Sequence, residues 1–172
     1  MGINNKRGLS GVVTALMLIL LALVLVGIVW AVISNLVEEK LQGSESCIDT
    51  FEKVTLGNSF TCYNATSKLS QISLNIADIS VDSVIISFAK GGTTKSIELT
   101  NTDKIIPNFG PYGGVLGVNV KLPGENGGLT YIFNGTAEGF DVGPLGAIEV
   151  RPVVSGNQCD TTDTIQGIDL CL

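Results

Sequence analysis

The hydrophobic and polar positions divide the chain into two regions with different periodicities. The first, residues 9–37, is a largely apolar run of 29 residues without a charged side chain. As an α-helix rising about 1.5 Å per residue, this run would reach about 43 Å, whereas the hydrocarbon core of a bilayer is about 30 Å thick. The pattern therefore predicts an apolar N-terminal helix that is longer than a membrane anchor needs to be.

The second region, from Cys47 onward, alternates apolar and polar residues with the period of two that is typical of half-buried β-strands. The clearest alternation lies in residues 72–76, 84–88, 96–100, 118–122, 129–133 and 148–150. Turn residues such as Gly91-Gly92 and Gly143-Pro144 separate these stretches. About eight short strands predict an α+β chain, in which the helix precedes an all-β antiparallel sandwich of immunoglobulin-like type or a small barrel.

Two local features refine this prediction for the head. Residues 51–56 and 59–63 flank Gly57-Asn58, which is the residue order of a β-hairpin and would bring Cys47 near Cys62. Pro152 cannot donate a hydrogen bond to a ladder, so we expect it at a sheet edge.

All four cysteines lie beyond the apolar run, at Cys47, Cys62, Cys159 and Cys171. An even count in an exported domain predicts two disulfides. Zinc is the alternative, but the first and last pairs lack the short CxxC spacing of structural zinc sites. Of the three possible pairings we favour Cys47 with Cys62 and Cys159 with Cys171, because both loops close locally, each stabilising the head by about 3 kcal/mol.

Charge and composition narrow the function. From Gln42 onward the chain has seven basic and fourteen acidic residues, a net charge of −7, which argues against binding nucleic acid through a basic face. The chain contains no histidine, the commonest general base and metal ligand. We therefore expect no enzyme, no cofactor and no metal site, although a surface hydrolase that uses carboxylates stays an open alternative.

The flanking charges indicate the orientation of the helix. Lys6 and Arg7 precede the apolar run, and Glu38 and Glu39 follow it. The positive-inside rule then keeps the N-terminus in the cytoplasm and places the head outside the cell.

The start of the chain resembles a known family. Lys6-Arg7-Gly8, followed by Leu9-Ser10-Gly11-Val12-Val13-Thr14 and the run to Val37, is similar to the class III signal peptide and N-terminal helix of archaeal type IV pilins. The resemblance implies that a prepilin peptidase cuts between Gly8 and Leu9, with Lys6 and Arg7 as the charged residues that it prefers. The chain departs from that pattern at Gly11, where proline is usual, and Val13 stands where bacterial type IV pilins have glutamate.

The residues of the helix favour association with copies of itself. Small residues recur at five positions, namely Gly11, Ala15, Ala22, Gly27 and Ala31. Two pairs of these have the four-residue spacing that lets helices approach closely. The alternative is a signal anchor that stays in the membrane as a monomer.

Two sequons, Asn64-Ala65-Thr66 and Asn134-Gly135-Thr136, mark Asn64 and Asn134 as candidate N-glycosylation sites at turns. The resemblance also implies glycosylation, because exported archaeal surface proteins of the pilin kind often carry N-glycans.

The sequence thus predicts four segments: a signal peptide at residues 1–8, an apolar helix at 9–41, a hinge at 42–46 and an extracellular β head at 47–172. The function expected from the resemblance is that of a structural subunit of a type IV pilus-like filament that serves adhesion. Its implied partners are copies of itself, the prepilin peptidase, and the assembly motor and membrane platform. The precursor would reside in the cytoplasmic membrane and the mature subunit at the cell surface. A membrane-anchored binding domain, or a minor pilin that does not polymerise alone, is the alternative function.

Overall fold

The computed structural model describes the backbone of residues 7–172 and the side chains of residues 11–34, 37 and 47–172. The chain forms two compact units that divide between Gln42 and Gly43. The first unit consists of most of helix α1 (Arg7–Ile48), and the second, Gly43–Leu172, contains the last turn of that helix and all the strands. This observation confirms a helix followed by a β head.

Helix α1 runs through residues 42–46, so the predicted helix end at residue 41 and the hinge after it are wrong. A single glycine costs a helix only about 1 kcal/mol relative to alanine, so Gly43 does not have to interrupt it. The helix ends after Ile48, where both the backbone N–H and the hydroxyl of Thr50 donate to the carbonyl of Cys47, at 3.1 and 2.7 Å.

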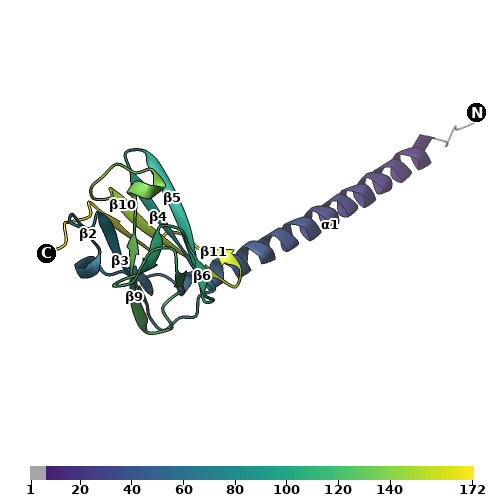
Figure 1. Ribbon diagram of the computed structural model, residues 1–172. Coiled ribbons are helices and arrows are strands. Elements are labelled where there is room, and N and C mark those ends of the chain that lie inside the picture. The colour runs from purple at the N-terminus through teal and green to yellow at the C-terminus, as the bar shows by residue number, and fades with distance from the viewer. Residues whose placement is uncertain (1–6) are drawn as a thin grey trace, which may run out of the picture. The chain divides into compact units, whose positions relative to one another are not determined.

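The head contains two five-stranded antiparallel sheets (Figure 1). Sheet A consists of β1 (Val54–Leu56), β2 (Cys62–Asn64), β3 (Leu69–Ile76), β9 (Gly127–Phe133) and β7 (Phe109–Pro111). Sheet B consists of β11 (Asn157–Gln158), β12 (Asp163–Gln166), β10 (Ala147–Val154), β4 (Ser83–Lys90) and β5 (Thr93–Thr100). A separate pair joins β6 (Lys104–Ile105) to β8 (Asn119–Val120), and two short 3-10 helices, η1 (Asn58–Phe60) and η2 (Thr136–Glu138), lie between strands.

The strand order is that of an immunoglobulin-like sandwich. Sheet A reads β1/β2–β3–β9–β7 and sheet B reads β11/β12–β10–β4–β5, which correspond to the A-B-E-D and G-F-C-C′ orders. Apolar residues that alternate along the strands fill one core between the sheets. Phe88 of sheet B stacks on Phe133 of sheet A, with ring centroids 4.1 Å apart.

The hairpin predicted around Gly57-Asn58 is wrong, because β1 and β2 do not pair with each other. Both pair with β3, one after the other along the same edge, and η1 connects them. The N–H of Gly57 donates to the carbonyl of Ser73 at 2.8 Å, so the chain continues along β3 rather than turning back. A Cβ at Gly57 would lie 2.9 Å from the Ser73 hydroxyl, which explains the glycine.

Pro152 lies on β10, which is an interior strand of sheet B, so its predicted place on an edge strand is also wrong. The carbonyl of Pro152 accepts from Cys159, and its nitrogen therefore faces the same side of β10. On that side the pairing with β12 stops at Val150 and the pairing with β11 starts at Val153. The proline therefore lies between two short neighbours, where its missing N–H removes only the bond that would be reciprocal to the one from Cys159.

Tyr131 connects the interior of the sandwich to the loop before β9. Its hydroxyl donates to the carbonyl of Lys121 at 2.6 Å, and its ring stacks on Phe109. Burial raises the pKa of the Tyr131 hydroxyl well above its usual range, because the charged phenolate would lose its hydration.

Candidate assembly helix and head surface

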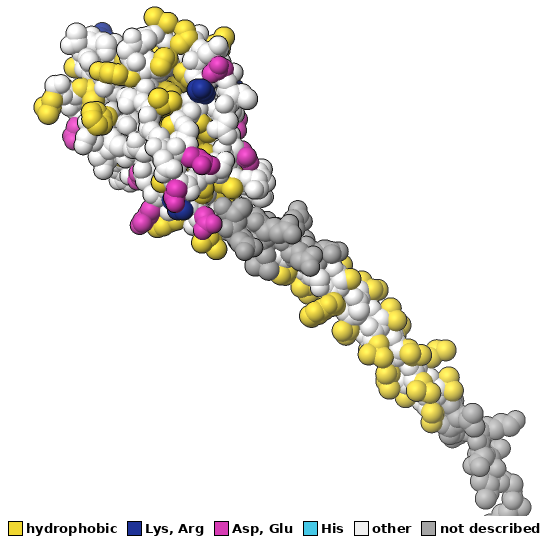
Figure 2. Space-filling model, turned by 90° about the horizontal axis from the view of Figure 1, so that it is seen from below, with side chains coloured by type: hydrophobic (Ala, Val, Ile, Leu, Met, Phe, Trp, Pro, Cys, Tyr) yellow, Lys and Arg dark blue, Asp and Glu magenta, His cyan; other side chains and the backbone are white. Residues whose placement is uncertain are grey.

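The segment Gly11–Ser34 of α1 is the one helix among the described residues that is long and apolar enough to cross a membrane, judged by length and composition. Every side chain from Gly11 to Ile33 is exposed, and Trp30 is 72% exposed. Figure 2 shows hydrophobic side chains along this part of the helix. In water this helix would expose apolar surface on every side, so it has to be covered by lipid or by other protein.

The five predicted packing residues of the helix fall on two faces. With about 100° between successive residues, Gly11, Ala15 and Ala22 lie within about 40° of one another. Gly27 and Ala31 lie about 160° further round the helix. A Cβ added at Gly11 or Gly27 would meet no atom within 4 Å, so the isolated chain places no steric demand for glycine at either position.

The predicted cleavage site lies at the limit of what the structure describes. Arg7, Gly8 and Leu9 belong to the backbone of α1. Their side chains, and Lys6 as a whole, lie outside the described residues. Cleavage between Gly8 and Leu9 therefore stays a prediction.

All four cysteines form disulfides, which confirms the predicted number of bridges and excludes a zinc site made of these thiolates. The favoured pairing is wrong: Cys47 pairs with Cys159, and Cys62 pairs with Cys171, with Cα atoms 5.3 and 5.0 Å apart. The local pairing depended on the hairpin that does not form. Each bridge instead joins residues more than 100 positions apart, which no local sequence signal could have indicated.

The two sequons lie at the same end of sheet A. Asn64 is the register partner of Leu69, and Phe133, just before Asn134, is the partner of Ser70. The two asparagines therefore flank the start of β3 on opposite sides, about two strand spacings or 10 Å apart. We call this the distal end of the head, and the opposite end, at Ile76, the proximal end. Lys53, just after α1, accepts a backbone hydrogen bond from Ala77 and so marks the proximal end.

Both sequon asparagines use the side-chain oxygen to cap a turn. Asn64 Oδ1 accepts from the N–H groups of Thr66 and Ser67, at 2.9 and 3.0 Å, and Asn134 Oδ1 accepts from Ala137 at 3.2 Å. Neither Nδ2 atom donates a hydrogen bond within the part of the chain that the structure describes. The capping role and attachment of a glycan to Nδ2 are therefore compatible.

In the described residues, no three His, Cys, Asp or Glu side chains lie close enough together to hold a metal ion. The carboxylate of Asp163, near the C-terminus, has a structural role instead. Its Oδ2 accepts from the N–H of Leu56 at 2.8 Å, a contact across 107 positions that sequence reasoning missed. No protein-family model, no curated protein and no solved structure matches the chain.

Proposed function

We propose that this chain is the precursor of a structural subunit of a type IV pilus-like extracellular filament, and that processing after Gly8 leaves Leu9 as the first residue. The observation that supports it best is the helix Gly11–Ser34, which exposes apolar side chains on all sides. Within lipid, close packing at the small residues favours association of such helices. Once they have left the membrane, each Leu, Ile or Val side chain kept from water is worth about 1.5–3 kcal/mol, which holds the helices in a common core.

The distribution of small residues favours an open assembly over a closed dimer. The face with Gly11 and Ala15 and the face with Gly27 and Ala31 lie on nearly opposite sides of the helix, so each can approach a different neighbour. Contacts that use two different faces are heterologous, and when they do not close into a ring they generate a filament.

In this proposal the head forms the outer surface of the filament. Its net negative charge, two disulfides and two sequons suit an exposed position outside the cell. Adhesion is the proposed service, with the prepilin peptidase, the assembly motor and the membrane platform as partners in biogenesis. The cytoplasmic membrane holds the precursor.

A membrane-anchored binding domain, or a minor pilin that does not polymerise alone, is the second candidate. The observation in its favour is the length of the apolar segment Gly11–Ser34, 24 residues, which is close to the roughly 20 residues that span a bilayer.

The mass of the mature N-terminal peptide separates pilin processing from simple anchoring. We expect protein purified from cells to begin at Leu9, and replacement of Gly8 with a bulky residue to leave the precursor uncut. An intact Met1, or a cut beyond the apolar helix, would contradict pilin-type processing.

A further inference from the structure

The two disulfides close a covalent ring along one side of the head. Residues 47–62 form one half of the ring and residues 159–171 form the other. The Cys47–Cys159 bridge closes the ring at the proximal end, and the Cys62–Cys171 bridge closes it at the distal end. The rest of the head, residues 63–158, is attached to this ring but is not part of it.

Hydrogen bonds hold the two halves side by side. Near the proximal end, the Thr162 hydroxyl donates to the carbonyl of Val54 at 2.9 Å, and Asp163 accepts from Leu56. At the distal end, Tyr63 forms a parallel bridge with Leu170. The N–H of Tyr63 donates to the carbonyl of Asp169 at 2.7 Å, and the N–H of Cys171 donates to the carbonyl of Tyr63 at 3.0 Å. The two halves therefore run in the same direction, from the helix toward the distal end.

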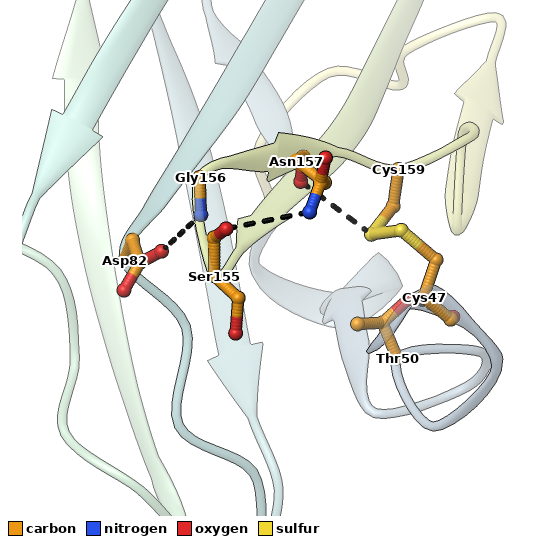
Figure 3. Close-up of a disulfide and its surroundings, with 7 residues drawn as sticks. All are labelled: Cys47, Thr50, Asp82, Ser155, Gly156, Asn157 and Cys159. Carbon is orange, nitrogen blue, oxygen red and sulfur yellow. Dashed lines mark hydrogen bonds between the residues drawn. A yellow bond between two sulfur atoms is a disulfide. The ribbon is translucent and has the colours of Figure 1, made fainter. Parts of the chain in front are cut away.

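The proximal bridge connects the last turn of α1 to Cys159, which follows the edge strand β11 and is hydrogen-bonded to β10. Cys47 lies in the last turn of α1, and Cys159 donates its backbone N–H to Pro152 on β10. Figure 3 shows this bridge beside the turn at Ser155 and Gly156, where the N–H of Gly156 donates to Asp82 at 2.9 Å. Without the bridge, the covalent path from α1 into the sheets runs through residues 49–53 to the three-residue edge strand β1.

We propose that this ring is a tension-bearing strap, which carries tension from α1 to the distal end of the head without passing it through residues 63–158. The shortest covalent path from Cys47 to the C-terminal residue crosses the first bridge and then follows residues 159–172. Either bridge alone is sufficient for this path, because with only one bridge intact the covalent connection from Cys47 to the C-terminus still bypasses residues 63–158.

The use of this strap in a filament rests on the proposed function, because only an assembled subunit would be pulled between its helix and its outer surface. The load path itself is a property of the single chain. It can therefore be measured without a filament, and failure to find filaments would leave the measurement unaffected.

The strap predicts how far the chain lengthens under force. An extended chain gains at most about 3.6 Å per residue. From Cys159 to Cys171 the strap holds 12 steps, worth about 43 Å, whereas the 125 steps from Cys47 to Leu172 are worth about 450 Å once both bridges are reduced. Reduction should thus add about 400 Å to the extended length.

The test is single-molecule force spectroscopy on the full chain in detergent, with handles at its two ends, before and after adding a reductant. Residues 1–46 lengthen equally in both states, so the difference reports the head alone. We expect the gain of about 400 Å on reduction. The local pairing of Cys47 with Cys62 and Cys159 with Cys171 would let the oxidised chain extend through residues 62–159, so reduction would add only about 100 Å. That result would overturn the proposal that the ring carries the tension.

The double variant C62S/C171S supplies the matched control. It retains the Cys47–Cys159 bridge, so the oxidised variant should extend no further than the oxidised wild type to within about 10 Å. A bridge limits extension whether or not the head is folded, so weaker folding of the variant does not obscure the outcome. Full extension of the oxidised variant would show that Cys47 and Cys159 are not joined, and would refute the proposal.

Discussion

Replacement of Phe133 with alanine tests the packing that joins the two sheets. Phe133 is 1% exposed and belongs to β9 of sheet A. Its ring stacks on Phe88 of sheet B at 4.1 Å and meets the edge of Phe140 at 6.2 Å. The substitution therefore opens a cavity between the sheets and removes two aromatic contacts at once.

Truncating a buried phenylalanine to alanine costs about 3–5 kcal/mol, since both transfer free energy and cavity contacts are lost. Because the stacked pair and the edge-on pair add about 0.5–1.5 kcal/mol each, we expect the upper part of that range. A head of this size has a total unfolding free energy on the order of 6–20 kcal/mol. The variant therefore keeps its fold but has a much smaller free energy of unfolding.

Urea titration of the full chain in mild detergent, followed by the near-ultraviolet circular dichroism of the buried aromatic residues, measures this loss. With a slope of about 2 kcal/mol per molar, the midpoint should fall by about 2 M. The matched control is Phe60→Ala, because Phe60 is 67% exposed and its loss should change the free energy by at most about 0.5 kcal/mol. Equal effects of the two substitutions would refute the sandwich core described above.

Three further predictions concern the helix, the sequons and the buried tyrosine. Val24→Lys places a charge near the middle of the apolar segment at a cost of about 2.5–3.5 kcal/mol, so we expect it to abolish filaments in electron micrographs. The control Val115→Lys, at a position 67% exposed in the head, should preserve them. Normal assembly of the helix variant would contradict a buried helical core. Thr66→Ala and Thr136→Ala each destroy a sequon but keep the asparagine cap, so each should remove the mass of one glycan from protein purified from its source; unchanged masses would show that the sites are unused. Because burial raises the pKa of Tyr131 in the folded state, the unfolded state releases this proton first and the free energy of unfolding falls as pH rises above about 10. Urea midpoints between about pH 9 and about pH 11 should show that fall, and Tyr131→Phe should reduce it; an unchanged fall in the variant would rule out Tyr131 as its cause.

The sequence predicted those parts of the fold that depend on local patterns. The uncharged run specified the helix, and the alternation of Ile72, Leu74 and Ile76 specified both the strand β3 and its buried face. The turn at Gly91-Gly92 was also predicted correctly, because both glycines adopt positive φ between β4 and β5. In each case the physical cause lies within a few residues of its effect.

The sequence did not predict features that depend on distant neighbours. Gly57-Asn58 has the composition of a hairpin, but pairing of both flanking strands with β3 overrides it. Pro152 tolerates an interior strand only because β12 stops and β11 starts beside it. The cysteine pairing follows from the same long-range arrangement, so it too could be found only once the order of the strands was known.

Electron cryomicroscopy of filaments sheared from cells that express this chain tests the central claim most directly. We predict a core of tightly packed apolar helices that begin at Leu9, covered by immunoglobulin-like heads whose cysteines pair as Cys47–Cys159 and Cys62–Cys171. The result that would contradict the account is an absence of filaments containing this chain, with the protein recovered only as a membrane-embedded monomer that still begins at Met1.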